Sequence, residues 1–285
     1  MSSTRKIGYF IMFVGIVLLT VCLSNLSVKI VSQGYLMDSF LKNQKEMSNE
    51  LASKIADYNS KVDFKKTGIV DPFNSEDIQL QDNKLIGADE IFGYLEIPKI
   101  NFKKPIYLGA SYEHLAKGVA QLDYTSIPVG GESTRSVICG HRGWYGDIML
   151  LKVGQLYSND VVYVHEHKRT LTYKVIGREY INPSQWEKLK PVVGKDMLTI
   201  LSCDPMYPPF TRRILINCVR VEEKSAGDST SHRKDSRESS VVTGRQADFN
   251  SKAIDYLVVA LSLISWAVLA VCVRGFVRDL KKYRK

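Results

Sequence analysis

The sequence lacks the short motifs that mark many cofactor-dependent and metal-dependent proteins. Within its 285 residues no Cys-x-x-Cys pair, glycine-rich phosphate loop or acidic metal cluster stands out. The few histidines have no zinc spacing. His165 and His167 alternate on an expected strand, where an exposed polar edge is favoured over a metal site. We therefore expect neither a cofactor nor a metal ion.

Cysteine is also scarce. Two of the five cysteines, Cys22 and Cys272, fall within apolar runs, where they are expected to be small apolar fillers. The other three are Cys139, Cys203 and Cys218, and this odd number indicates a free thiol. Because no paired redox motif accompanies them, an extracellular thiol–disulfide protein is disfavoured.

A third absence concerns the N-terminus, whose apolar run is followed by no small-x-small cleavage site and no lipobox. This run, Ile7 to Leu26, is expected to remain as an anchor within residues 1–26. A second apolar run at 253–273 is long enough to be another span. Basic residues precede the first run and follow the second, in a tail at 274–285. Because such flanks stay in the cytoplasm, we expect a two-pass protein with both termini cytoplasmic and the intervening chain outside the cell.

The net charge of +9 does not indicate a nucleic-acid-binding protein. Arg5, Lys6 and the tail at 274–285 together carry all but about two of these charges. The long segment between the two apolar runs is therefore close to neutral. The excess of positive charge therefore reflects membrane topology, and no nucleic-acid partner is expected.

Composition divides the chain between the apolar runs into four segments. Residues 27–60 carry apolar residues at helical spacing and predict amphipathic helices. Residues 61–90 have little periodicity, which is typical of a long functional loop. Residues 91–222 consist of short alternating runs with frequent turns, which predict a mainly β fold, a closed barrel or a sandwich, with short helices. Residues 223–252 have almost no apolar side chains and predict a flexible linker.

Three side chains of the β region suggest chemistry. One apolar strand is expected to end at Cys203, and after a loop with three prolines the next begins at Arg213. Another apolar strand is expected to end at His141. An imidazole near a cysteine lowers the pKa of the thiol, and an arginine can stabilise the oxyanion of acyl transfer. The residues alone leave a purely structural role open.

A resemblance to a known family favours the chemical role. The segment Thr199–Cys203 resembles the T-L-x-T-C signature of sortases, and Arg213–Ile216 is similar to the R-L-L-V strand that follows it. Gly140-His141-Arg142-Gly143 resembles the histidine motif of the family, and the sites occur in family order within a match from about Phe92 to Val221. The resemblance implies a closed sortase-type β-barrel and a cysteine transpeptidase, with His141, Cys203 and Arg213 as catalytic residues.

Two further features resemble class C, the pilin-polymerising sortases of Gram-positive bacteria. They are the two apolar runs and Asp71-Pro72-Phe73 in the loop ahead of the barrel. In that class a lid covers the site, so the resemblance implies that Asp71 pairs with Arg213 and that Phe73 lies on Cys203. It also implies cleavage of LPxTG-like sorting signals between Thr and Gly, and joining of pilin subunits through lysine isopeptide bonds in pilus assembly. The expected partners are pilin subunits and the membrane, with a monomeric catalytic domain.

Two departures from the family pattern leave alternatives open. The loop after Cys203 is one residue longer than in many sortases, so Arg212 competes with Arg213, which is preferred because it abuts the apolar run. Cys139 shares a face with His141 on an extended strand, and a buried spare thiol is preferred there over an inhibitory disulfide with Cys203. For function, the alternatives are a sortase that attaches surface proteins to peptidoglycan and a non-catalytic pilus-assembly scaffold.

Overall fold

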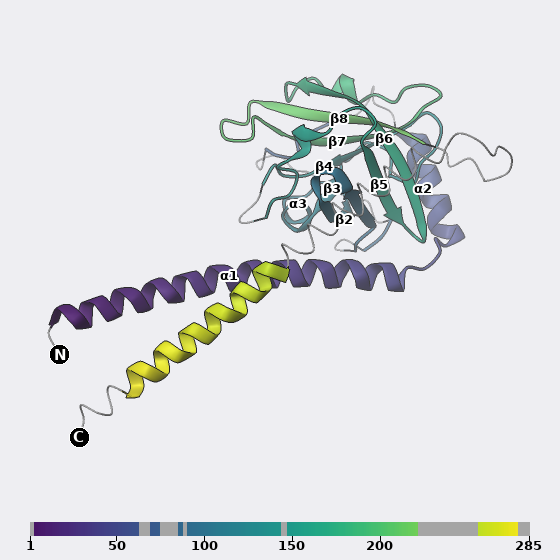
Figure 1. Ribbon diagram of the computed structural model, residues 1–285. Helices are drawn as coiled ribbons and strands as arrows, with labels where there is room; N and C mark the ends of the chain where they lie inside the picture. Colours follow the sequence, from purple (N-terminus) through teal and green to yellow (C-terminus); the bar gives the residue numbers. More distant parts are fainter. Residues whose placement is uncertain are drawn as a thin grey trace, which may run out of the picture. The chain divides into compact units, whose positions relative to one another are not determined.

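A computed structural model of the protein describes residues 3–62, 69–74, 85–87, 90–143, 147–221 and 256–278 (Figure 1). The chain divides into two units. A helical unit lies within Met1–Asp38 and Asp248–Lys285, and a second unit, Ser39–Ala247, contains the β-strands. Three expected segments fall outside the described residues: the linker at 223–252, most of the loop at 61–90, and the tail beyond Arg278.

The helical unit contains two long apolar helices. Helix α1 runs without a break from Ser3 to Asn43, so residue 26 is not a helix boundary. Its Ile7–Ser32 portion, and a second helix at Tyr256–Arg278, are long and apolar enough to cross a membrane. The hydroxyls of Thr20 and Ser265 lie 2.6 Å apart between these helices. Such a bond satisfies polar groups that would find no water inside a bilayer.

Helix α2, Asn49–Lys61, is amphipathic, as the spacing of its apolar residues predicts. It begins at Ser48, whose hydroxyl accepts a hydrogen bond from the backbone N–H of Leu51. Ile55 is buried against the core of the barrel, and Met47, Leu51 and Tyr58 pack beside it. The opposite face is exposed and carries two i,i+4 ion pairs, Glu50–Lys54 and Asp57–Lys61.

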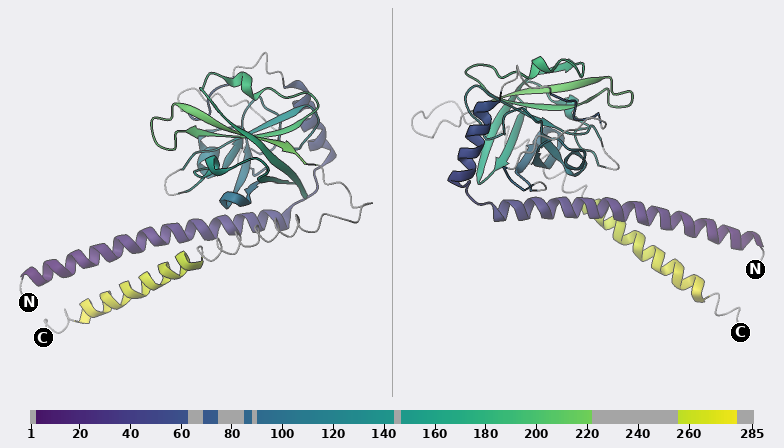
Figure 2. Two further views of the ribbon diagram at one scale, coloured as in Figure 1. Left: turned by 45° about the horizontal axis from the view of Figure 1, so that its top comes forward. Right: turned by 180° about the vertical axis from the view of Figure 1, so that it is seen from behind.

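The second unit is a closed barrel, which is one of the two architectures that the sequence predicts. Its strands follow one another in space in the order β1-β2-β3-β4-β7-β8-β6-β5. Figure 2 shows the barrel in two further views. Most neighbours are antiparallel, but β2 pairs with β3, and β4 with β7, in parallel. The bounds of the strands are β1 Gly93–Ile97, β2 Phe102–Leu108, β3 Val119–Gln121, β4 Thr134–Cys139, β5 Val161–Glu166, β6 Arg169–Ile181, β7 Asp196–Asp204 and β8 Arg212–Arg220.

Short helices occupy several connections, as the sequence predicts. Helix α3, Tyr112–Lys117, begins with Ser111 as its N-cap and packs on β3. The 3₁₀ helices are η1 Pro98–Ile100, η2 Val153–Gln155 and η3 Trp186–Leu189. The expected hairpin turn at His167 and Lys168 joins β5 to β6, and both residues have positive φ.

Two apolar clusters follow from the alternation of side chains along each strand. The larger one contains residues from all eight strands and therefore fills the interior of the barrel. The smaller one lies on the outside of β2, β3, β4, β7 and β8 and at the end of β6, and is covered by Leu115 of α3 and Leu189 of η3. Leu201 of β7 belongs to this outer cluster, whereas its neighbour Ile200 points inward. Because side chains alternate, Cys203 shares the outer face with Leu201.

Candidate active site

The parallel pair β4 and β7 positions two of the three predicted catalytic residues. Cys139 is opposite Leu201, and beyond the end of β4 the N–H of Gly140 still donates to the carbonyl of Leu201 at 3.1 Å. The hydroxyl of Ser202 in turn donates to the carbonyl of Gly140 at 2.8 Å. Continuing the register of Cys139 with Leu201 by two residues brings His141 to the level of Cys203. The two strands therefore end together, with the histidine and the cysteine at the same rim of the barrel.

The antiparallel pair β7 and β8 brings the arginine to that rim. Cys203 is directly opposite Arg213, so the two side chains leave the sheet on the same face. Arg212 is opposite Asp204, one residue on, and therefore leaves on the other face. There it donates to Asp204 at 2.8 Å and lies over the ring of Tyr180 at 5.1 Å. Of the two arginines that the sequence leaves in competition, Arg213 is the one beside Cys203.

Residues 69–74, here called the lid segment, contact this rim through Asp71. The carboxylate of Asp71 accepts two hydrogen bonds from Arg213, from Nε at 3.1 Å and from Nη2 at 2.5 Å. The side chains are only 12% and 6% exposed, so this two-point ion pair is largely withdrawn from water. Nη1 of Arg213 donates to the carbonyls of Phe210 and Arg212. The guanidinium is therefore held from two sides, by the lid segment and by its own strand.

Phe73 of the lid segment covers the rim with its ring. A turn that places the N–H of Asn74 3.2 Å from the carbonyl of Asp71 directs the ring towards the barrel. The ring centroid lies 5.3 Å from the Arg213 guanidinium carbon and 5.7 Å from the centroid of the His141 ring. Phe73 also packs on the outer apolar cluster. Its contact with the sulfur of Cys203 remains a prediction.

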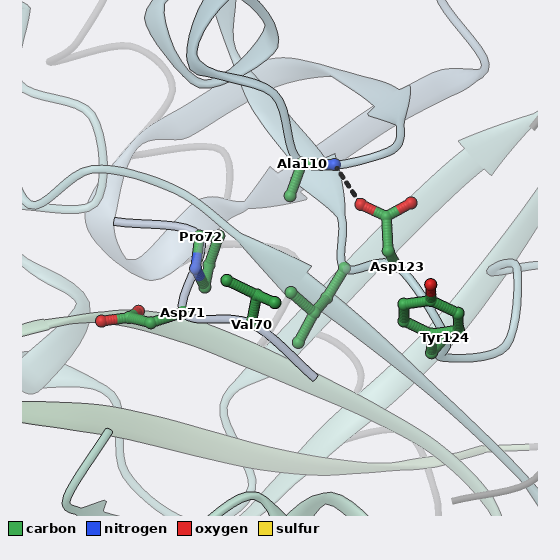
Figure 3. A pocket seen from close by; sticks show the side chains of 7 residues that line it. Val70, Asp71, Pro72, Ala110, Asp123 and Tyr124 are labelled. Atoms are coloured by element: carbon green, nitrogen blue, oxygen red, sulfur yellow. Dashed lines mark hydrogen bonds between the residues drawn. The ribbon is translucent and has the colours of Figure 1, made fainter. Parts of the chain in front are cut away.

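Beneath the lid segment lies a small cavity of about 20 Å³. Figure 3 shows Val70 and Asp71 on one side of it, with Ala110 and Asp123 on the other. Asp123 accepts a hydrogen bond from the backbone N–H of Ala110, and burial raises the pKa of its carboxyl. The cavity has room for about one water molecule, so the lid segment fills this part of the surface almost completely.

Burial controls the electrostatics of the cysteine and the histidine. Cys203 is 6% exposed, and its burial raises the pKa of the thiol to about 11; Arg213 opposes this rise, Asp71 adds to it and Arg142 opposes it. Burial lowers the pKa of His141 to about 4. At neutral pH both groups are therefore uncharged while the lid segment is in place, and the thiol is a weak nucleophile.

Sequence reasoning assigned no role to Arg142 and Asp204, which the structure brings to the same rim. Nη1 of Arg142 donates to the backbone carbonyl of Cys203 at 3.1 Å and to Oδ1 of Asp204 at 2.8 Å. Both side chains are about one-tenth exposed. The signal in the sequence was their position, because each directly follows a predicted catalytic residue, His141 or Cys203.

Cys139 is a buried thiol without a disulfide, as are Cys203 and Cys218. Its Sγ lies 3.1 Å from the carbonyl of Ala120, and burial raises the pKa of the thiol well above the usual range. These features are consistent with the preferred view of Cys139 as a spare thiol within the outer cluster.

No group of three or more potential metal ligands occurs in the part of the chain that the structure describes. The two histidines of the expected polar edge are engaged with carboxylates. Nε2 of His165 lies 2.8 Å from Glu96, and Nδ1 of His167 lies 3.0 Å from Glu166. The structure does not show the exposed polar edge that the sequence favoured, because β5, which carries His165, pairs with both β1 and β6, and the two histidine side chains are only 17% and 21% exposed.

A closed barrel with a cysteine, a histidine and an arginine at neighbouring strand ends is the arrangement that the resemblance to sortases implies. The sortase domain family matches residues 95–221, and the chain belongs to this family. The family assignment made from the short motifs is thus confirmed.

Solved structures of class C sortases are among those similar to this chain. The pilus-related sortase C of Group B Streptococcus is 30% identical, with a TM-score of 0.57, and the match covers 61% of this chain and 89% of that one. Sortase C of Streptococcus pneumoniae is 28% identical, with a TM-score of 0.58, over 68% of this chain and 100% of that one. Among curated proteins, sortase A of Bacillus anthracis is 20% identical over 167 residues, which are 58% of this chain and 76% of that protein. The chain is therefore a sortase whose structural neighbours include class C enzymes.

Proposed function

We propose that this protein is a membrane-anchored class C sortase, a cysteine transpeptidase that joins pilin subunits. In this proposal it cleaves an LPxTG-like sorting signal between Thr and Gly and transfers the threonyl group to a lysine of another pilin. The observation that carries the proposal is the two-point ion pair between Asp71 and Arg213, with the ring of Phe73 beside His141. This contact is the one that the resemblance to class C implies.

In the first step, once a sorting signal has displaced the lid segment, the thiol of Cys203 gives its proton to His141. The thiolate that results attacks the carbonyl carbon of the threonine in the sorting signal. The carbonyl oxygen becomes an oxyanion, which Arg213 stabilises from the adjacent position on β8. His141 gives a proton to the leaving amine of the glycine, and the C–N bond breaks. A thioester between the threonine and Cys203 remains.

In the second step, the amine of an incoming lysine attacks this thioester. His141 removes the proton from the amine, the sulfur of Cys203 leaves as a thiolate, and an isopeptide bond forms. Water competes with the lysine as nucleophile, and its attack would release the pilin without joining it. The apolar ring of Phe73, beside His141 and Arg213, limits the access of water before a substrate arrives.

The lid segment gives the resting enzyme a low reactivity. The carboxylate of Asp71 binds the guanidinium of Arg213, which would otherwise be available to stabilise the oxyanion. The closed lid segment also buries the thiol of Cys203, whose pKa is raised to about 11. Displacement of the lid segment by a sorting signal would free Arg213 and admit the substrate to Cys203. The protein would thus become active only where a substrate can compete with Asp71 and Phe73.

The two apolar helices fit attachment to the cell membrane. We propose that both cross it, with both termini in the cytoplasm and the barrel outside, because basic residues flank the outer ends of the helices. This orientation places the catalytic rim on the side of the membrane where pili are assembled.

The decisive experiment supplies the full-length protein with a pilin that carries an LPxTG-like signal, in the presence of both a second pilin with an acceptor lysine and a peptidoglycan amine. Mass spectrometry of the product should find threonine joined to a lysine side chain. A product joined instead to a peptidoglycan amine would favour the cell-wall alternative. Polymer formation that persists undiminished in Cys203→Ala would favour the scaffold alternative and contradict catalysis by this thiol.

A further inference from the structure

We propose that Arg142 is a positioning residue that fixes the turn carrying His141 to the strand end carrying Cys203. This inference rests on the proposed function, because it concerns how the two reacting groups are held together. It is carried by one set of contacts: the guanidinium of Arg142 bonds the backbone carbonyl of Cys203 and the carboxylate of Asp204.

The contacts of Arg142 lie just beyond the last hydrogen bonds between β4 and β7. The bonds between β4 and β7 end with the N–H and the carbonyl of Gly140. His141 follows immediately, and its carbonyl accepts from the N–H of Leu150 rather than from β7. Gly143 then has a φ of +119°, which turns the chain away from the strand direction. Arg142, between these points, reaches back from the turn to the end of β7.

Both hydrogen bonds of Arg142 have a charged donor, and such bonds are stronger than those between neutral groups. The side chains of Arg142 and Asp204 are 9% and 10% exposed, so water competes little for either charge. The second oxygen of Asp204 is taken by Arg212 at 2.8 Å, which holds the carboxylate in place. Gly154 leaves room for the guanidinium, since a Cβ at this position would lie 3.0 Å from Nη2 of Arg142.

This arrangement also gives Arg212 a function separate from that of Arg213. Arg213 lies on the face of Cys203 and is available to the substrate once Asp71 leaves. Arg212 lies on the opposite face, where it binds Asp204, the partner of Arg142, and lies over the ring of Tyr180. The two adjacent arginines thus lie on opposite faces of β8. Arg213 faces the reacting atoms, whereas Arg212 binds the carboxylate that Arg142 also binds.

The proposal predicts a loss of turnover rather than of substrate binding. Misplacement of a reacting group by about 1 Å costs roughly 100-fold in rate, so Arg142→Met should lower kcat by about 30- to 100-fold. KM for a sorting peptide should change by less than about threefold, because Arg142 lies on the face opposite the lid segment and Arg213. Arg178→Met is the matched control: Arg178 also donates to a backbone carbonyl near this rim, that of Gly154, but touches neither Cys203 nor Asp204.

A charge-preserving variant separates position from electrostatics. Besides Arg142, the charged groups that act on the Cys203 thiol are Arg213 and Asp71, and His141 lies at the same rim. Arg142→Lys restores the positive charge, so the pH profile of Cys203 alkylation should return to that of the wild type. It should not fully restore kcat, because Nη1 alone makes both contacts in the wild type, and the ammonium of a lysine is one bond closer to the backbone than Nη1.

The experiment uses the full-length protein in detergent, with peptide cleavage for kcat and KM and iodoacetamide alkylation for the sulfur. Folding is checked by thermal unfolding, and Asp204→Asn tests the same contact from its other side if Arg142→Met does not fold. Equal kcat in Arg142→Met and Arg178→Met, or full recovery of kcat by Arg142→Lys, would overturn the positioning role alone. A wild-type protein that cleaves no sorting peptide would overturn the proposed function instead.

Discussion

Replacement of Asp71 by alanine should expose Cys203 to bulky reagents, because Asp71 is the charged attachment of the lid segment. The replacement removes two charge-assisted hydrogen bonds to Arg213 from a position that is largely withdrawn from water. Hydrogen bonds to charged groups contribute about 1.5–3 kcal/mol each. Arg213 keeps its bonds to the carbonyls of Phe210 and Arg212, so the loss is smaller than for an isolated buried charge.

We take about 2 kcal/mol as the loss of closure free energy, which corresponds to roughly a 30-fold larger open population. If a bulky thiol reagent reaches Cys203 only when the lid segment is open, the rate of labelling should rise by about the same factor. Phe73→Ala should act in the same direction through loss of the ring beside Arg213 and His141. The assay is the rate of modification of Cys203, followed by mass spectrometry of the intact protein.

A change in thiol ionisation must be distinguished from opening, because Asp71 also raises the pKa of Cys203. Removal of Asp71 lowers this pKa and moves the pH profile of labelling towards lower pH, whereas opening raises the rate at every pH. Asp57→Ala is the matched control, since it breaks an exposed ion pair with Lys61 on α2 and should change the rate by less than about twofold. A labelling rate in Asp71→Ala equal to that of this control would refute the lid assignment.

Three further outcomes follow from the same site. Arg213→Lys should lower kcat/KM by about 100- to 1000-fold through loss of the oxyanion donor, whereas Arg212→Lys should lower it far less; steady-state peptide cleavage compares the two. Cys139→Ala should leave the rate of peptide cleavage within about twofold of the wild type, because the Cys139 thiol lies within the outer cluster. If oxidants inhibit the wild type but not this variant, a disulfide between Cys139 and Cys203 is favoured instead. The pKa of His141 is lowered to about 4, below its value in the unfolded chain, so the folded state resists protonation of this residue. The free energy of unfolding should therefore be constant above about pH 6.5 and fall towards pH 4, by about 1–2 kcal/mol after allowance for partial exposure. Urea unfolding at several pH values should find this slope in the wild type and a smaller one in His141→Gln.

The fold followed from the sequence because its signals were local. The continuous apolar runs Met197–Leu201 and Ile214–Val219, with the prolines between them, predict two strands joined by a loop, and β7 and β8 are these strands. Alternation could not decide between a barrel and a sandwich, since both bury one face of each strand. The closure of the barrel depends on pairs such as β1 with β5, which are far apart in the sequence.

The site was predicted only in part, for a similar reason. Positions at strand ends indicated Cys203, His141 and an arginine, but the choice between Arg212 and Arg213 depends on which face each leaves. The register of β7 with β8 decides this, because it sets Arg213 opposite Cys203. The bonds of Arg142 were beyond sequence reasoning, because they join a turn to a strand end about sixty residues later. Only the folded chain brings these groups together.

The parallel ladder of β4 and β7 separates the chemistry of this enzyme from its choice of substrate. Each of the two strands has a neighbour on both sides of a closed barrel, so neither can slide without breaking hydrogen bonds along its whole length. The connections before β7 and after it, residues 182–195 and 205–211, lie outside this ladder, although Leu189 packs on the outer cluster and the carbonyl of Phe210 binds Arg213. We expect insertions away from these two contacts to reshape the rim and to leave the sulfur where it is. An insertion of one residue within β7 would turn the sulfur to the other face of the sheet and end the reaction.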